Sequence, residues 1–197
     1  MQNLIIMNAI VILAAGASTR FGLPKQNLTY HPNESLLQNA IRHAMAVSDT
    51  VLVVLGANRE SIEFSIKDQP VTILYNPEWA EGMASSVRLA VEKLRTDFLQ
   101  ISSALFMLCD QPYADADLLL KIVNAAQNDK GIIASHYNDT LGAPVLFKAK
   151  YFPYLIALKG AEGARNLIQQ HADDVEPIDF PLGEVDIDTP EDWERFR

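Results

Sequence analysis

The chain has 197 residues, of which 49% are hydrophobic and 21% are charged, and its formal net charge is −9. This acidic balance disfavours a general nucleic-acid-binding protein, and no apolar run has the length of a membrane span. The single cysteine excludes an internal disulfide and indicates a reducing compartment. We therefore predict one domain over residues 1–197, located in the cytoplasm, with neither a nucleic acid nor a membrane as partner.

The first predicted element is a buried strand over residues 10–13, which ends abruptly in small residues. The loop that follows carries Arg20 and Lys25 and has no carboxylate between them. Gly16 has no Cβ, so it lets the backbone approach a ligand closely. Two cations in an acidic chain favour an anionic ligand, above all phosphate. From these residues alone, an ordinary strand-to-helix turn with two surface cations is the alternative.

The two common phosphate-loop patterns do not fit this segment. The Walker pattern needs Gly-Lys-Ser/Thr at its end, whereas Gly22 is followed by Leu23. The dinucleotide pattern needs a glycine where the chain has Ser18. The missing glycine disfavours a nicotinamide-dependent dehydrogenase.

Further along the chain, short apolar runs alternate with helical stripes, which is typical of a doubly wound α/β fold. Strands are predicted at 51–55, 71–74 and 104–108, and helices around stripes at 36–45, 83–94 and 118–126. After residue 131, strands are predicted at 132–135, 144–147 and 175–179 around a helix near 162–170. We expect a mostly parallel mixed sheet with a late antiparallel strand and a Rossmann-like N-terminal half.

Residues 76–86 leave a predicted strand and enter a helix. Gly82, Ser85 and Ser86 near the helix N-terminus can offer N–H and hydroxyl groups to a ligand. On the residues alone, a plain N-terminal cap is the favoured interpretation.

Asp110 follows the predicted strand at 104–108, at the end where a parallel sheet presents catalytic groups. A hard oxygen ligand there suits Mg²⁺, which favours carboxylates and substrate phosphates. The alternative is a cap for the next helix, a role that Asp115 could fill instead.

Asp186 and Asp188 are expected on one face of a short strand, because alternate residues of a strand share a face. Thr189 and Pro190 then begin a helix as N-cap and first residue. Capping accounts for Asp192 but for neither Asp186 nor Asp188.

Cys109 ends an apolar strand and has no histidine near it in sequence, which favours a core residue over a nucleophile. Trp79 and Trp193 are predicted to pack rather than to serve as stacking platforms. The four histidines are scattered and show no zinc-ligand spacing.

The segment LAAGASTRFGLPK resembles the N-terminal signature of the MobA-like nucleotidyltransferases, L-A-[AG]-G-x-S-x-R-[MF]-G-x-x-K. The resemblance recurs in NPEWAEGMASSV, LCDQP, GAPVLF, KGAEGAR and DIDTPEDW, in that order along nearly the whole chain. Within the superfamily, the likeness is greatest to the molybdenum cofactor cytidylyltransferases.

This resemblance implies an Mg²⁺- or Mn²⁺-dependent enzyme that transfers CMP from CTP to the phosphate of molybdopterin and releases pyrophosphate. It implies a nucleotide-binding half over about residues 1–112 and an acceptor-binding half over about 113–197, with a client molybdoenzyme as protein partner. The implied catalytic residues are Lys25, Arg20 and Asp110, and the implied metal ligands are Asp110 and Asp188. The implied nucleotide-binding residues are Leu13, Ala14, Ala15, Gly16, Arg20, Lys25, Asn76, Gly82, Ser85 and Ser86.

Two positions depart from the family pattern. Ala143 stands where relatives often carry His, and Ala161 stands where they usually carry Asp. Both belong to the acceptor half, so the acceptor is less well supported than the nucleotide. The alternatives are guanylyl transfer, transfer to a sugar or alditol phosphate or to methylerythritol phosphate, and a non-catalytic nucleotide-binding cofactor chaperone.

Overall fold

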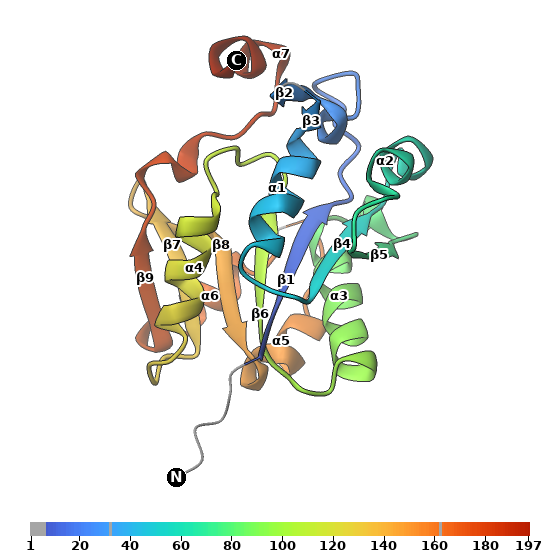
Figure 1. Cartoon of the computed structure of the whole chain (residues 1–197). Helices are drawn as coiled ribbons and strands as arrows, with labels where there is room; N and C mark the ends of the chain where they lie inside the picture. Colours follow the sequence, from blue (N-terminus) through green and yellow to red (C-terminus); the bar gives the residue numbers. More distant parts are fainter. Residues whose placement is uncertain (1–6, 32, 162) are drawn as a thin grey trace.

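A seven-stranded sheet forms the centre of the structure, a computed structural model that describes residues 7–31, 33–161 and 163–197 (Figure 1). The strands are β1 (Met7–Ala14), β4 (Val51–Leu55), β5 (Thr72–Tyr75), β6 (Ile101–Leu108), β7 (Ile132–Tyr137), β8 (Thr140–Lys148) and β9 (Val175–Asp179). Their order is β5-β4-β1-β6-β8-β7-β9. Strand β8 runs antiparallel to both neighbours, while the other pairs are parallel. The predicted mixed, mostly parallel α/β sheet is confirmed.

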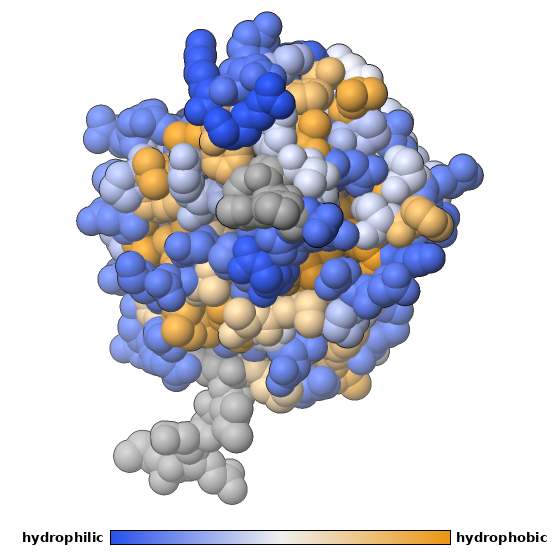
Figure 2. All heavy atoms as spheres, turned by 45° about the horizontal axis from the view of Figure 1, so that its top comes forward, coloured by the Kyte–Doolittle hydropathy of each residue, from blue (hydrophilic) through white to orange (hydrophobic). Residues whose placement is uncertain are grey.

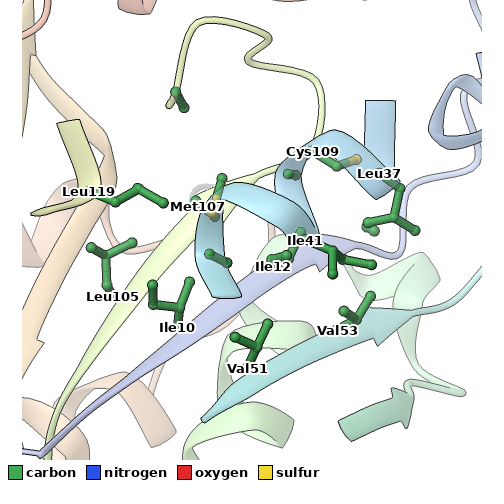
Figure 3. Close-up of a cluster of buried hydrophobic side chains, with 14 of the residues drawn as sticks. Ile10, Ile12, Leu37, Ile41, Val51, Val53, Leu105, Met107, Cys109 and Leu119 are labelled. Atoms are coloured by element: carbon green, nitrogen blue, oxygen red, sulfur yellow. The ribbon is translucent and has the colours of Figure 1, made fainter. Parts of the chain in front are cut away.

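Helices cover both faces of the sheet because the central strands are apolar on both sides. One face packs against α1 (Leu36–Met45), α2 (Arg59–Ile66) and α4 (Ala116–Ala125). The other packs against α3 (Met83–Asp97), α5 (Phe152–Ile156) and α6 (Arg165–Gln170). Figure 3 shows the first of these cores, where Ile10, Ile12 and Val53 of the sheet meet Leu37 and Ile41 of α1. The alternation along β1 therefore divides its side chains between two cores.

A third, smaller cluster lies beside the loop that follows β1. It joins Leu36 and Ile187 to Trp193 of α7 (Pro190–Phe196), and Phe21 and Leu28 pack against it. The short hairpin β2 (Thr29–His31) and β3 (Glu34–Ser35) lies next to it, as Figure 1 shows at the top. The C-terminal helix thus covers the loop that carries the predicted cations.

Some local predictions need correction. Residues 185–188 form no strand: they follow a 3-10 turn, η5 (Pro181–Glu184), and the Ile187 amide bonds the Asp110 carbonyl (3.0 Å) instead of a ladder partner. Helix α2 was not among the predicted stripes, because only Ile62 and Ile66 of its residues are buried. The predicted helix near 162–170 begins at Arg165, and residue 162 lies outside the described residues.

The strand order places the carboxyl ends of β1 and β6 together. From β1 the chain first builds β4 and β5 on one side and then crosses to β6 on the other. Such a reversal opens a crevice outside the carboxyl ends of the two strands, where α/β proteins bind ligands. No helix of the described residues is long and apolar enough to cross a membrane.

Candidate active site

A cavity of about 290 Å³ opens at the carboxyl ends of β1 and β6. Its lining includes eight of the predicted site residues: Leu13, Ala14, Ala15, Gly16, Lys25, Gly82, Ser86 and Asp110. These residues come from the end of β1 and the loop after it, from the start of α3, and from the segment that follows β6. The structure therefore brings together segments that lie about 95 residues apart in the sequence, as neighbouring parallel strands require.

Lys25 lies between two carboxylates at this cavity. Its Nζ is 2.5 Å from Asp110 Oδ2 and 2.7 Å from Asp188 Oδ1, and its side chain is only 13% exposed. Arg20, which is largely exposed, reaches the other oxygen of Asp188 at 3.2 Å. Two cations and two carboxylates thus form one chain of ion pairs, although neither Arg20 nor Asp188 lines the cavity itself.

The surroundings keep Lys25 protonated. Burial alone would lower the pKa of its ammonium group, but the charge of Asp110 and the hydrogen bonds to Asp110 and Asp188 outweigh this effect and raise the pKa. Burial, together with the negative charges of Asp110 and Asp188, raises the pKa of Asp186 to about 7. The carboxylates that pair directly with Lys25 are those of Asp110 and Asp188.

The carboxylates offer oxygen for a metal ion. Asp110 Oδ1 is buried and accepts no hydrogen bond from the described residues. No three His, Cys, Asp or Glu side chains in that part of the chain could hold an ion by themselves. Mg²⁺ typically takes one or two carboxylates and completes its shell with water and substrate phosphates. Asp110 and Asp188 fit that kind of site.

The wall made by residues 76–86 is more internally bonded than predicted. Asn76 Nδ2 donates to Ser85 Oγ (2.8 Å) and to Ser86 Oγ (2.9 Å), and both Asn76 and Ser85 are buried. Ser85 Oγ in turn bonds the carbonyls of Glu78 and Gly82. Asn76 and Ser85 therefore stabilise the wall from behind, whereas Gly82 and Ser86 line the cavity.

The same wall is bonded to residues 158–160 in the C-terminal half of the chain. The Arg88 guanidinium pairs with both carboxylate oxygens of Glu81 (2.7 and 2.6 Å) and donates to the Leu158 carbonyl (2.9 Å). The Gly160 amide donates to Glu81 (3.2 Å), and the Gly160 carbonyl accepts from the amide of Ala84 (3.2 Å). Residues 158–161 thereby close one side of the cavity.

Several cavity residues were not predicted as site residues. Gln26, which is 1% exposed, lies under the loop after β1 and lines the cavity, but no pattern marks it in the sequence. Trp79 lines the cavity and is 36% exposed, whereas Trp193 is buried as expected. Cys109 also lines the cavity, but burial and the charge of Asp110 raise the pKa of its thiol to about 12. A neutral thiol is a poor nucleophile.

A second cavity, of about 180 Å³, adjoins the first and shares Leu13, Met83 and Leu108 with it. Much of its lining comes from residues 137–168 and is apolar, with Arg165 and Tyr137 among its few polar side chains. Ala143 is one of its lining residues, while Ala161 lines the first cavity. In Figure 2, this end of the molecule is tilted towards the viewer, and small hydrophobic areas lie between hydrophilic ones.

Comparison with protein families gives a match to the model of the MobA-like NTP transferase domain over residues 10–175. The molybdenum cofactor cytidylyltransferase of Escherichia coli is 27% identical over 193 residues, which cover 95% of each chain. The molybdenum cofactor guanylyltransferase of Haemophilus influenzae is 30% identical over 165 residues, which cover 81% of this chain and 79% of the relative.

Among solved structures, Rv0371c from Mycobacterium tuberculosis superimposes with a TM-score of 0.83 at 25% identity, covering 96% of this chain and 97% of its own. A second structure of that mycobacterial protein is a complex with manganese and superimposes with a TM-score of 0.76.

Proposed function

The chain belongs to the MobA-like NTP transferase family, and from that premise we propose that it transfers CMP from CTP to the terminal phosphate of a molybdopterin cofactor. The observation that carries the proposal is the cluster of Lys25, Asp110 and Asp188 beside the cavity under the glycine-containing loop. This arrangement suits the joining of two phosphate groups, because such chemistry depends on positioning and on stabilising negative charge.

Each part of the cluster has a distinct task in this proposal. Lys25, held protonated, stabilises the charge that develops on the transferred phosphate and on the leaving pyrophosphate. Arg20 at the exposed rim binds the outer phosphates of the triphosphate. Asp110 and Asp188 hold Mg²⁺, which draws negative charge from the triphosphate oxygens when it is bound. The acceptor phosphate itself is the nucleophile, so no protein nucleophile is needed.

The relatives support a nucleotide donor and a divalent metal but leave the base open. The E. coli relative is a cytidylyltransferase, and the mycobacterial neighbour has been solved with manganese. The second cavity is the proposed site of the acceptor. Molybdopterin as the acceptor receives less support, because the lining of this cavity includes Ala143, where the family often has a histidine. A non-catalytic cofactor chaperone is disfavoured, since it would need neither Asp110 nor Asp188 next to Lys25.

The direct test is to incubate the protein with Mg²⁺, molybdopterin and each nucleoside triphosphate in turn and to measure pyrophosphate. We expect release with CTP that depends on both the metal and molybdopterin. Pyrophosphate release with CTP and a sugar phosphate, but not with CTP and molybdopterin, would show that the proposed acceptor is wrong and that the proposed type of reaction is right. No release with any nucleotide and acceptor would contradict the proposed activity.

The guanylyltransferase from H. influenzae makes GTP the second candidate donor. Ala15 lines the cavity and is 8% exposed, and guanylyltransferases tend to have Gly at the matching position of the motif. A methyl group there can crowd a purine while it tolerates a pyrimidine, and one methyl group is worth only ~1–3 kcal/mol of discrimination. We therefore expect graded selectivity, with CTP preferred over GTP.

Competition between CTP and GTP measures this preference, and the variant Ala15→Gly should shift it measurably toward GTP. If the unchanged protein already prefers GTP, the cytidylyl assignment is wrong while nucleotidyl transfer stands. If Ala15→Gly leaves the ratio unchanged, Ala15 does not set the base preference.

A further inference from the structure

Gln26 is a buried polar side chain whose hydrogen-bonding groups all have partners. Its Nε2 donates to the carbonyls of Ala14 and Gly16, at 3.0 Å each. Its Oε1 accepts a hydrogen bond from the Ser18 hydroxyl at 3.3 Å. A buried amide with three bonds to one short loop fixes the conformation of that loop, because breaking any of them would leave a polar atom unpaired.

These bonds determine which backbone groups face the cavity. The carbonyls of Ala14 and Gly16 accept from Gln26, and the carbonyl of Ala15 accepts from the Ala57 amide at 3.1 Å. All three residues line the cavity. With these carbonyl oxygens engaged by the protein, the backbone groups that Ala15 and Gly16, beyond the β1 ladder, can offer to a ligand are their amides. Amides attract phosphate, whereas carbonyl oxygens would repel it.

The same network reaches Lys25. The Ser18 hydroxyl that donates to Gln26 accepts a hydrogen bond from the Lys25 amide at 3.2 Å. Ser18 has a φ of 53°, so the loop makes a left-handed turn there that the hydroxyl contacts help to hold. One side chain therefore fixes both the start of the loop, where it leaves β1, and its end, where the cluster of ion pairs begins.

Open space lies where a phosphate would need it. A Cβ added to Gly16 would meet no protein atom within 4 Å, so Gly16 faces free volume rather than a packed wall. In a chain of net charge −9, uncharged donors beside Lys25 add attraction for a triphosphate without adding a flexible side chain. The loop can do this only while Gln26 holds its carbonyls away.

We propose that Gln26 is a positioning residue that holds the carbonyls of Ala14 and Gly16 so that the amides of the loop after β1 bind the phosphates of the nucleotide. The inference rests on the proposed function, in that the cavity must bind a nucleoside triphosphate. In this role, Gln26 affects the binding of the phosphates and not the binding of the base. A residue that only stabilises the fold would affect both equally.

The test compares Gln26→Met with the unchanged protein by calorimetric titration with CTP and with cytidine, in the presence of Mg²⁺. Methionine keeps the length and shape of glutamine and removes both donors and the acceptor. We expect the affinity for CTP to fall about 10- to 100-fold, which corresponds to the loss of two or three hydrogen bonds from the loop amides to the phosphates. The affinity for cytidine, which has no phosphates, should change less than about twofold.

Gln38→Met is the matched control. Gln38 also bonds the backbone through its side chain, to the Ser65 carbonyl and the Ser35 amide, but it caps α1 and does not line the cavity. We expect it to lower thermal stability and leave the affinity for CTP unchanged. A second test variant, Ser18→Gly, removes the hydroxyl while it permits the positive φ, and it should weaken CTP binding several-fold but not cytidine binding.

The outcomes separate the inference from the function on which it rests. Unchanged CTP affinity in Gln26→Met, or equal losses for CTP and cytidine, would overturn the role of Gln26 while the proposed function stands. If Gln26→Met does not fold, Ser18→Gly decides by the same ratio of affinities. If the unchanged protein binds no nucleoside triphosphate, the proposed function fails and the inference falls with it.

Discussion

Lys25 is the residue at which the charges of the site meet. Its ammonium group contacts carboxylates that come from the end of β6 and from the segment before α7. Because burial would otherwise favour its neutral form, the two carboxylates are what keep it charged. Changes to any one of these three residues should therefore affect the reaction more than they affect the fold.

Asp110→Asn should lower turnover by about a hundredfold or more and leave the fold intact, because it replaces a charged ligand with a neutral group of the same shape. Release of pyrophosphate at saturating CTP and Mg²⁺ measures the loss, and circular dichroism checks the fold. Full activity in this variant would remove Asp110 from the mechanism.

Lys25→Ala should slow the chemical step by about two to four orders of magnitude if Lys25 stabilises charge at the transferred phosphate. Arg20→Ala should instead weaken the binding of CTP more than that of CMP, because Arg20 lies at the exposed rim. Titration with both nucleotides distinguishes the two roles. Equal losses for CTP and CMP in Arg20→Ala would place Arg20 away from the outer phosphates.

At this scale, the sequence indicated the charged side chains of the candidate site but not the hydrogen bonds around them. Lys25 and Asp110 stand out because charged residues follow apolar strands. Gln26 does not stand out, because its side chain bonds backbone carbonyls. Every residue has a backbone carbonyl, so the sequence does not show which of them a side chain will bond. Asn76 and Ser85 are predicted to bind the nucleotide, and the structure shows that both side chains are buried and bonded to each other. Spacing alone does not say which side of a turn a polar group will face.

At the scale of elements, the cavity depends on how closely two loops approach each other. Gly82, between η2 (Trp79–Glu81) and α3, has a φ of 120°, and a Cβ there would lie 2.7 Å from the Ala161 Cα and 2.8 Å from the Gly160 carbonyl oxygen. Both neighbours are backbone atoms, so neither can move aside cheaply. The absence of a side chain at Gly82 is what allows residues 160–161 to pack closely against the wall made by residues 76–86.

Gly82→Ala should therefore lower the free energy of unfolding by about 2 kcal/mol or more and raise the KM for the nucleotide. Gly160→Ala is the control, because Gly160 also has a positive φ, 76°, but its added Cβ would meet no atom within 4 Å. We expect the control to cost about 1 kcal/mol and to change KM little. Urea denaturation and steady-state kinetics measure both, and similar KM values in the two variants would contradict the argument.

At the scale of the whole molecule, the candidate active site and a hydrogen-bonded carboxylate lie at opposite ends of the sheet. The active site lies at the carboxyl ends of β1 and β6, whereas Asp174 lies at the amino ends of β7 and β9. Its carboxylate accepts from Tyr151 (2.6 Å), Lys150 (2.6 Å) and the Gly131 amide (3.0 Å). Burial alone would raise the pKa of Asp174, but these hydrogen bonds lower it to about 2.

Asp174→Asn should lower the free energy of unfolding by about 1–2 kcal/mol at pH 7 and leave catalysis intact. A carboxyl whose pKa is lowered in the folded protein stabilises it above its unfolded pKa of about 4, and this contribution disappears as the pH falls toward 2. The difference between variant and unchanged protein should therefore narrow over that range. Asp179→Asn, at a side chain that is 90% exposed, is the control. A difference that does not depend on pH would contradict this account.

The fold as a whole was more predictable than the site, for a physical reason. Strands such as β4 and β6 are buried on both faces, so they read as continuous apolar runs, and α1 and α4 show clear apolar stripes. Apolar and acidic residues also alternate over 185–188, but the Ile187 amide bonds the Asp110 carbonyl in a loop and not a neighbouring strand. Alternation indicates that two faces differ, and only the three-dimensional contacts decide whether a ladder forms.

The contact of α7 with the loop after β1 also determines the order in which the site can be made. Lys25 and Asp110 leave the ribosome well before Asp188 and before Trp193, whose cluster covers Phe21 and Leu28. At a synthesis rate of about 5–20 residues per second, the delay between Asp110 and Asp188 is roughly 4–16 seconds. During that interval the nascent chain lacks one of the two carboxylate partners of Lys25 and the helix that packs against the loop after β1. The cluster of ion pairs can therefore be complete only once Asp188 and the last helix have been made.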